Sequence, residues 1–377
     1  MTRVAIFHNI PAPYRIPLFD ALAGKYDLLI LFSQAQEKGR LWSVNRLDMK
    51  FPYVFLDEQS FELFGKNIVI NINIGKVLDD FNPEVVIGHD NPPNILTTLW
   101  VASYCRRRNI PFILWTGNFP GYTAGRAFYF RLMGALLKSI RRLVYRRAQA
   151  FCAYGEETKR LLMHDFGVPP GDIFTGTQGY PEILFQPFFQ IPNLETKWKN
   201  NVILFIGYLR SKPDKGVKDL IFVFKQLIND GIRAKLVIIG DGERRQALES
   251  FAGEYPVCFL GHQEKQEKYR WLYDAKVLIL PSKSDSWGWV VNEAMFSYLP
   301  VIVSNSAMAK EMVNHGKNGY IYSPNDLASL SHYLKTIMTH NFTTYQAMCH
   351  YAFQVAQNYG LARSLNCFQQ SIAKVSL

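Results

Sequence analysis

Short β-type runs alternate with helical patterns along most of this 377-residue chain, and that alternation limits what it can fold into. A strand followed each time by a helix predicts a doubly wound parallel sheet. The alternation stops over 178–200, where prolines interrupt every period, and it restarts at Val202. The sequence therefore predicts an α/β protein with two such domains, and the length suffices for two hydrophobic cores.

The expected elements follow the same order in both halves. In the first half the predicted strands are Val4–His8, Asp27–Phe32, Val54–Leu56, Val85–Gly88, Pro111–Trp115 and Ala150–Tyr154, with helices at about 16–24, 92–108, 126–147 and 156–166. In the second half they are Val202–Gly207, Lys235–Gly240, Val257–Leu260, Val277–Pro281 and Pro300–Val303, with helices at about 216–229, 242–252, 265–273, 292–298 and 343–375. We expect a first domain over 1–180, a linker over 181–200 and a second domain over 201–354. A C-terminal helix at about 355–377 is a candidate to pack back on the first domain.

Composition argues against several classes of protein. No run of about 18 apolar residues occurs, so no segment is expected to span a bilayer. The start, MTRVAIFHNIPAP, predicts a strand that enters a proline-rich loop rather than a signal peptide. Five scattered cysteines without CxxC spacing indicate reduced thiols, with neither a disulfide framework nor a zinc site. We therefore expect a cytoplasmic protein.

Residues 281–303, PSKSDSWGWVVNEAMFSYLPVIV, place two carboxylates around a glycine. Asp285 and Glu293 stand eight residues apart, and a predicted helix from Asn292 to about Tyr298 leads into the next strand. A helix N-terminus offers N–H groups to phosphate, and carboxylates accept hydrogen bonds from sugar hydroxyls. The segment is therefore typical of a site for an anionic, hydroxyl-rich ligand such as a nucleotide sugar.

The second predicted domain opens with FIGYLRSKPDKGVKDLI, residues 205–221. A strand ends at Gly207, the loop carries Arg210, and Lys215 lies at the entrance of a helix. These features suit a diphosphate, because the helix dipole, free N–H groups and point charges converge there. Taken alone, the same residues also fit an ordinary β–α loop with solvated cations.

A further glycine turn follows in LVIIGDGERRQAL, residues 236–248. Gly240 allows the backbone to approach a ligand closely at the junction of strand and helix. An ordinary tight turn, in which Asp241 caps the helix, fits the same residues equally well.

Near the N-terminus, HNIPAPYRIPLFDAL (8–22) predicts a strand–loop–helix junction stiffened by prolines. Arg15 is a candidate to contact an anion or an acceptor molecule from this junction. The alternative is a proline-bounded helix start with a solvated arginine.

The net charge of +11 is concentrated in one stretch of the first half. Between Asp90 and Glu156 no acidic residue occurs. The same stretch carries ten basic residues: Arg106, Arg107, Arg108, Arg126, Arg131, Lys138, Arg141, Arg142, Arg146 and Arg147. A localised excess of this kind indicates an anionic partner.

Part of this stretch, residues 126–149, predicts a basic amphipathic helix. Its apolar stripe consists of Tyr129, Leu132, Met133, Leu136, Leu137, Ile140, Leu143 and Val144. Such a helix suits a leaflet rich in anionic lipid, and it also fits a domain helix packed on a sheet. We expect the stripe to be mostly core and the basic segment 106–147 to meet an anionic membrane surface. Nucleic acid is not expected as a partner, because the aromatic residues lie on the stripe rather than among the cations.

Together these motifs resemble the retaining glycosyltransferases of family 4, which have the GT-B fold. The resemblance covers most of the chain and is strongest from 202 to 323. The matching pieces are FIGYLRSKPDKG, LVIIGDGE, VCFLGH, AKVLILPS, SDSWGWVVNEAMFSYLPVIVSN and HGKNGYIYSP, with PYRIPLFDAL and YGEETKRLLMHDFGVPPGDIF in the first half. The resemblance implies two Rossmann-like domains facing across a cleft, the first on the acceptor side and the second binding the nucleotide-sugar donor.

The resemblance also implies roles for the matching residues. Arg210 and Lys215 would hold the donor diphosphate, and Glu293 would bind the ribose as the second acid of an E-x7-E motif. Asp285, the first acid, would face the transferred sugar, so the candidate catalytic residues are Asp285, Lys215 and Arg210. The other donor-binding candidates are Gly207, Gly240, Ser286, Trp287 and Gly288, and the acceptor-side candidates are Arg15 and Asn118.

Three places depart from the family pattern. Asp285 stands where the family usually has Glu, which bears on the choice of sugar. Tyr208 stands where relatives carry the arginine of a Gly-Arg pair, and that role is assigned here to Arg210. Gly117 and Asn118 occupy a place where many relatives carry a histidine, so the acceptor side is the least defined part of the site.

For the reaction, the resemblance implies transfer of a hexosyl-type sugar from a nucleotide-diphosphate donor with retention, in bacterial-type surface polysaccharide or glycolipid assembly. The departing phosphate would itself take the acceptor proton, so no protein nucleophile, metal or other cofactor is expected. Two alternatives stay open. One is a GT-B protein that binds a nucleotide sugar without transferring it, and the other is a nucleotide-sugar epimerase of the same fold, which would need no acceptor.

Overall fold

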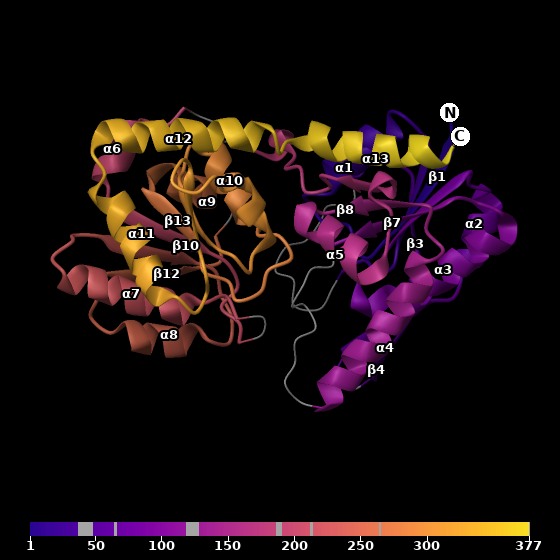
Figure 1. Ribbon diagram of the computed structural model, residues 1–377, viewed down its shortest axis with the longest axis horizontal. Coiled ribbons are helices and arrows are strands. Elements are labelled where there is room, and N and C mark those ends of the chain that lie inside the picture. Colours follow the sequence, from indigo (N-terminus) through magenta and orange to yellow (C-terminus); the bar gives the residue numbers. More distant parts are fainter. Residues whose placement is uncertain are drawn as a thin grey trace. The chain divides into compact units, whose positions relative to one another are not determined.

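The computed structural model describes residues 1–36, 48–63, 66–117, 128–185, 191–211, 214–263 and 265–376. The chain divides into two compact units (Figure 1). The first unit consists of Met1–Pro181 and Leu361–Leu377, and the second of Glu182–Gly360. Each unit has its own sheet and its own core.

Within the described ranges, the first unit is built on a parallel sheet of seven strands, in the order β3-β2-β1-β6-β7-β8-β9. The strands are β1 Arg3–His8, β2 Asp27–Phe32, β3 Tyr53–Phe55, β6 Val85–His89, β7 Phe112–Thr116, β8 Ala150–Ala153 and β9 Ile173–Thr175. A separate antiparallel hairpin joins β4 (Glu58–Leu63) to β5 (Lys66–Asn71). The chain adds strands first on one side of β1 and then on the other, which creates a topological switch point between β1 and β6.

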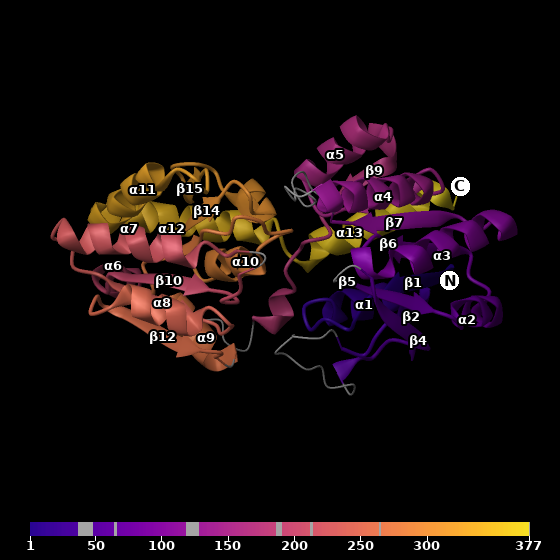
Figure 2. The ribbon, with the colours of Figure 1, turned by 90° about the horizontal axis from the view of Figure 1, so that it is seen from below.

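Helices cover both faces of this sheet (Figure 2). One face carries α1 (Ile16–Ala23) and α13 (Leu361–Val375), and the other carries α2 (Ile74–Phe81), α3 (Ile95–Arg108), α4 (Phe128–Tyr145) and α5 (Glu156–Phe166). Ile6 packs with the first pair of helices, while its neighbour Phe7 packs with the second group. Successive side chains of a strand point to opposite faces, so a continuous apolar run fits a strand covered on both sides.

The second unit contains a parallel sheet of six strands, counted over the described residues, in the order β12-β11-β10-β13-β14-β15. The strands are β10 Val202–Ile206, β11 Lys235–Ile239, β12 Val257–Gly261, β13 Val277–Leu280, β14 Val301–Ser304 and β15 Gly319–Tyr322. The helices are α6 Leu194–Lys199, α7 Val217–Asn229, α8 Arg245–Ala252, α9 Lys265–Asp274, α10 Trp289–Phe296, α11 Leu327–Thr339 and α12 Phe342–Gln357. Phe205, Phe224 and Leu330 represent β10, α7 and α11 in one shared core.

The predicted doubly wound parallel architecture is confirmed in both units. Several short or partly exposed elements were not predicted, namely β4, β5, β9, β15, α2 and α11. Strands of three or four residues offer too few positions for an alternating pattern to be recognised, because tertiary pairing decides whether they form at all.

The C-terminal stretch over 343–375, predicted to be helical, consists of two helices. Helix α12 belongs to the second unit, and α13 belongs to the first. The chain turns between them at Gly360, where an added Cβ would lie 1.6 Å from Glu182 Oε1. In the first unit, the Ser364 hydroxyl of α13 accepts a hydrogen bond from the N–H of Gly179 at 2.8 Å and thus helps to fasten α13.

Residues 182–200, expected to form a linker, belong to the second unit. Within them α6 is capped by Asn193, whose Oδ1 accepts a hydrogen bond from the N–H of Thr196 at 3.0 Å. Lys197 of this helix is buried, and its Nζ donates to the carbonyl oxygens of Leu272 and Ser297 at 2.8 and 2.9 Å. Burial lowers the pKa of Lys197 from 10.5 to about 7.

We expect Lys197 to make the stability of the protein depend on pH. Between about pH 7 and 10.5 the unfolded chain binds a proton at Lys197 that the folded chain has released, so the free energy of unfolding should rise with pH, by up to about 1.4 kcal/mol per pH unit. Urea unfolding measured across this window should show a shallower rise for Lys197→Met. The exposed, ion-paired Lys199 provides the control, and an unchanged slope in Lys197→Met would contradict the assignment.

Candidate functional site

The carboxyl ends of β10, β11 and β13 are neighbours in the second sheet, and the loops that leave them touch backbone to backbone. The N–H of Gly207 donates to the carbonyl oxygen of Ile239 at 2.9 Å. A Cβ at Gly240 would lie 1.9 Å from the carbonyl oxygen of Gly207, and one at Gly216 would lie 2.0 Å from that of Pro281. Only glycine allows both approaches, so these loops converge on the sheet edge where open α/β sheets bind ligands.

Lys215 and Asp285, two of the predicted catalytic residues, meet at this edge. Lys215 Nζ donates to Asp285 Oδ2 at 2.6 Å, and each side chain is 16% exposed. The other carboxylate oxygen, Oδ1, accepts the N–H of Trp287 at 3.3 Å. The ammonium group is therefore held in one place while it remains partly open to solvent, which suits an incoming phosphate.

Asp214 anchors the loop that carries Lys215. Its Oδ1 accepts hydrogen bonds from the N–H of Gly216 at 2.9 Å and from Arg244 Nη1 at 3.1 Å. Its Oδ2 lies 3.5 Å from Lys283 Nζ. Three loops of the site are thus joined at one carboxylate, which limits the freedom of the backbone beside Lys215.

Arg210 lies over the ring of Tyr208, with 4.4 Å between the guanidinium carbon and the ring centroid. The tyrosine that replaces the family arginine therefore supports Arg210 through a cation–π contact. Glu243 fastens the same loop, because its Oε1 accepts the N–H and the hydroxyl of Ser211 at 2.7 and 2.9 Å. The role of Arg210 toward a diphosphate stays a prediction.

The sequence predicted that this helix starts at Asn292. In the structure, helix α10 starts at Trp289. Gly288 is its N-cap, with a φ of 104° that side-chain-bearing residues rarely adopt. The helix N-terminus therefore follows the Asp285 loop directly. As a consequence Glu293 lies in the second turn of α10, whereas the predicted start at Asn292 would place it in the first turn.

The three residues predicted to contact the donor before α10 differ in exposure. Ser286 is exposed, whereas Gly288 and Trp287 are buried. Trp287 Nε1 donates to Asn292 Oδ1 at 2.8 Å, so the indole is part of the protein interior. The indole of Trp287 is therefore not placed to contact a ligand, and an approach of the donor to its main chain stays a prediction.

Glu293 forms a partly buried ion pair with Lys268 of α9. Lys268 Nζ lies 2.7 Å from Glu293 Oε1, and the two side chains are 21% and 12% exposed. A carboxylate expected to bind ribose hydroxyls is therefore oriented by a lysine from another helix. Lys268 was not predicted, because nothing in its local sequence distinguishes it from a solvated lysine.

Replacing Lys268 by Met should raise KM for the donor about tenfold with little change in kcat. The reason is that a misplaced Glu293 loses binding energy in the ground state and the transition state alike. Steady-state kinetics would measure both constants. Lys268→Arg should retain the ion pair, and Lys265→Met, an exposed neighbour on the same helix, is the matched control. A loss confined to kcat would contradict this role.

In the first unit Arg15 is buried at 3% exposure. Its Nη1 donates to the carbonyl oxygen of Thr177 at 2.6 Å, and its guanidinium carbon lies 4.6 Å from the ring centroid of Trp115. The alternative of a solvated arginine is therefore wrong, while an acceptor contact stays a prediction. Asn118 lies outside the described residues.

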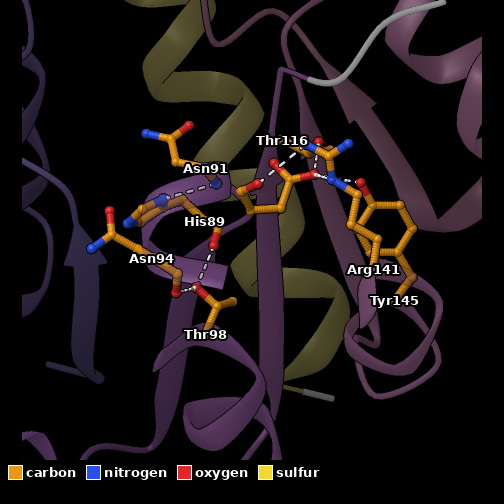
Figure 3. Close-up of polar contacts among 8 residues, drawn as sticks. His89, Asn91, Asn94, Thr98, Thr116, Arg141 and Tyr145 are labelled. Carbon is orange, nitrogen blue, oxygen red and sulfur yellow. Dashed lines mark hydrogen bonds and ion pairs between the residues drawn. The ribbon is translucent and has the colours of Figure 1, made fainter. Parts of the chain in front are cut away.

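Asp90, directly after β6, is the centre of a buried polar network (Figure 3). Its Oδ2 accepts hydrogen bonds from the hydroxyls of Thr116, at 2.9 Å, and Tyr145, and lies 3.5 Å from Arg141 Nε. Burial and the charge of Asp90 raise the pKa of Tyr145 well above its ordinary value. Arg141, one of the ten residues of the basic stretch expected to face an anionic partner, is thus interior. The network attaches the C-terminal half of α4 to the carboxyl ends of β6 and β7.

Two neutral histidines stand beside this network at the ends of β1 and β6. His8 Nδ1 lies 3.0 Å from the carbonyl oxygen of Ile10 and must donate to it, while His89 Nδ1 accepts the N–H of Asn91 at 3.3 Å. Burial lowers the pKa of both rings, that of His89 to about 3. His89 therefore carries its proton on Nε2, a buried atom with no hydrogen-bond partner among the described residues. The ring centroids are 5.8 Å apart at the switch point.

Two family models match this chain. Residues 189–355 match the model described as glycosyl transferases group 1. Residues 52–175 match the model described as glycosyltransferase family 4. Both units therefore carry a domain typical of GT-B glycosyltransferases.

Two curated relatives are also described as sugar-transferring enzymes. The sulfoquinovosyl transferase SQD2 of Arabidopsis thaliana is 21% identical over 267 residues, which is 68% of this chain and 50% of that protein. The putative glycosyltransferase EpsF of Bacillus subtilis (strain 168) is 30% identical over 222 residues, 56% of each chain. The chain thus matches about half the length of these two curated relatives.

Solved structures confirm the GT-B fold. The lipopolysaccharide outer core galactosyltransferase WaaB superposes with a TM-score of 0.70 at 16% identity, covering 99% of each chain. Anabaena Alr3699/HepE in complex with UDP and glucose gives a TM-score of 0.71 at 15% identity, covering 99% of this chain and 100% of that one. No helix in the described part of the chain is long and apolar enough to cross a membrane.

Proposed function

We propose that this protein transfers a sugar from a nucleoside diphosphate sugar to an acceptor during the assembly of a glycolipid or polysaccharide. The observation that carries the proposal is the Lys215–Asp285 pair at the carboxyl edge of the second sheet, next to the N-terminus of α10. A fixed ammonium group and helical N–H groups suit the diphosphate that leaves during transfer. The two glycosyltransferase family models support the same reaction class.

We further propose that the transfer proceeds with retention, and the same arrangement supports this proposal. Both oxygens of Asp285 already accept hydrogen bonds, from Lys215 and from the N–H of Trp287. A carboxylate held this way is a poorer nucleophile than a free one, which favours a reaction in which the leaving phosphate takes the acceptor proton on the same face. The protein then acts by orienting two substrates and stabilising the charge on the diphosphate.

A uridine nucleotide sugar is the first donor to test, because Anabaena HepE, which has the same fold, was solved with UDP and with UDP-glucose. For the acceptor, the basic segment 106–147 favours a lipid-linked molecule at an anionic membrane surface. Arg15, buried beside Trp115 in the first unit, is the acceptor-side candidate within the described residues.

The test is nucleoside diphosphate release across a panel of nucleotide sugars, with and without candidate acceptors. Release from one donor, lost in both Glu293→Ala and Lys215→Ala, would support the proposal and name the sugar. Donor binding without release under any condition would favour a non-catalytic subunit. Conversion of the donor sugar without acceptor would favour an epimerase. The anomeric configuration of the product would decide retention.

Transfer should not require a divalent metal, because Lys215 and Arg210 supply the positive charge that a metal provides in other sites. Activity measured after EDTA treatment should therefore match untreated enzyme. A loss of activity that Mg²⁺ or Mn²⁺ restores would overturn this expectation.

A further inference from the structure

Helices α3 and α4 of the first unit pack side by side (Figure 1). Exposed apolar and basic side chains of these two helices form a mixed surface. We call it the α3–α4 surface; its residues are Leu96, Trp100, Ser103, Arg106 and Arg107 of α3, with Leu136 and Leu143 of α4 and Arg147 just beyond it. A groove of about 490 Å³ runs along α3 and reaches Arg147. Because Arg147 Nη1 donates to the carbonyl oxygen of Leu143 at 2.5 Å, the groove borders the exposed side of α4.

The apolar part of this surface is unusually exposed. Ten large hydrophobic side chains are exposed among the described residues, and four of them lie here. Leu136 and Trp100 are 55% and 40% exposed. The expectation that the α4 stripe is mostly core therefore holds for Leu137, Ile140 and Val144 but not for Leu136 or Leu143. Clustered exposed apolar side chains mark a binding surface rather than a random surface composition.

The basic part keeps its charge uncompensated. Three of the ten basic residues in this stretch are ion-paired with Asp79, Asp90 and Asp165. Arg106 and Arg107 are exposed, and no ion pair involves them within the described ranges. No acidic residue occurs between positions 90 and 156 to repel an anion. Guanidinium groups bind phosphate oxygens in a bidentate manner, so these arginines are suited to phosphate headgroups.

We propose that the α3–α4 surface docks on a bilayer that contains anionic phospholipid. Arg106, Arg107 and Arg147 bind headgroup phosphates, while Trp100, Leu136 and Leu143 enter the interfacial region. Apolar insertion and charge attraction together give stable peripheral binding that neither gives alone. This inference rests on the proposed function and deepens it, because it names the surface at which a lipid-linked acceptor is met.

A bilayer suits this surface better than nucleic acid. Binding to single-stranded nucleic acid depends on aromatic faces that are free to stack on bases. The Trp100 ring instead stacks on Tyr104, with centroids 5.5 Å apart and an interplanar angle of 21°. A Cβ at Gly75 would lie 2.6 Å from the same ring. Its exposed part is therefore suited to a lipid interface, where tryptophan is favoured.

The test is flotation of the full chain with vesicles of phosphatidylcholine alone or mixed with phosphatidylglycerol. We expect binding only to the mixed vesicles, and about thirtyfold weaker binding of the double variant Arg106→Gln, Arg107→Gln, since each basic residue near an anionic leaflet contributes about a factor of five. Trp100→Ser should also weaken binding, and its residual binding should be more sensitive to salt because only charge attraction remains.

Matched controls come from the second unit. Lys335→Gln with Arg270→Gln removes the same charge, and Phe222→Ser removes an exposed aromatic side chain that is 44% exposed. Both controls should bind mixed vesicles like the wild type, and unfolding curves would show that every variant folds. Equal binding by the arginine variant and its control would overturn the proposal. So would Arg106-dependent capture of an oligonucleotide in preference to mixed vesicles.

Donor turnover separates this proposal from the proposed function. All surface variants should release nucleoside diphosphate at the wild-type rate with a water-soluble acceptor, because the substituted residues belong to the first unit and Lys215 belongs to the second. Vesicle binding without turnover on any donor would leave the surface standing and overturn the proposed function. Turnover without vesicle binding would support the proposed function and overturn the proposal that the α3–α4 surface binds a membrane.

Discussion

Replacing Lys215 by Ala should lower kcat for nucleoside diphosphate release by about 100- to 1,000-fold, the cost of removing one preorganised group that stabilises transition-state charge. Lys215 Nζ is held 2.6 Å from Asp285 by a loop that Asp214 fastens. Its charge is therefore already in place when negative charge develops on the leaving diphosphate. Pre-steady-state and steady-state kinetics on the cognate donor would measure the loss.

The pattern of the loss distinguishes catalysis from binding. If Lys215 acts mainly in the transition state, kcat falls and KM for the donor changes little. Lys218→Ala is the matched control on α7, because Lys218 lies over Phe251 rather than at the sheet edge. A rise in KM alone, or an equal effect of Lys218→Ala, would contradict the assigned role. Asp285→Asn should leave Lys215 less well placed and cause a smaller loss.

Replacing Asp90 by Ala should destabilise the protein by about 3–5 kcal/mol, because Arg141 would remain buried without its counter-charge. The two side chains are 5% and 4% exposed, so water cannot compensate for the missing carboxylate. Thr116 and Tyr145 would lose the acceptor of their hydroxyls as well. Urea unfolding with hydrogen exchange across α4 and β7 would measure and locate the effect.

Two comparisons test this explanation. Asp79→Ala removes an exposed ion pair with Arg108 and the hydrogen bond that Asp79 accepts from the Tyr104 hydroxyl, and it should cost only about 1–2 kcal/mol. Adding Arg141→Met to Asp90→Ala should restore part of the lost stability, because the isolated buried charge is then removed. Strictly additive losses, or equal costs at Asp79 and Asp90, would show that the network is not coupled.

Much of the fold could be predicted because its signals are local. The strand β10 and all of β2 after Asp27 are continuous apolar runs, and the helix α5 has the spacing and boundaries that its sequence predicts. The glycines at 207 and 240 directly follow the ends of β10 and β11, and those at 216 and 288 are the N-caps of α7 and α10. The sequence failed to predict some element boundaries and short elements, such as the start of α10 and the strand β15. Packing rather than periodicity decides where these elements form.

The candidate site could be predicted only in part, for the same physical reason. Lys215 and Asp285 were recognised separately from their loops, but their contact spans 70 positions and depends on the order of strands in the sheet. Lys268 joins Glu293 from another helix, and its local sequence carries no mark of that role. In the sequence, Asp90 borders the basic stretch and Arg141 lies inside it. Nothing in the local sequence indicates that the two side chains are buried together.

The sequence by itself determined the two doubly wound domains and the chemistry of the loops at their strand ends, because apolar periodicity and residue type act over a few neighbouring positions. Only the tertiary structure decided which charges pair, which are buried and which remain exposed. Among the described residues of the basic stretch, it placed one arginine in the interior, two cations in surface ion pairs and an exposed group beside Trp100. Such assignments depend on distances between segments far apart in the chain, and those distances exist only once the sheets have formed.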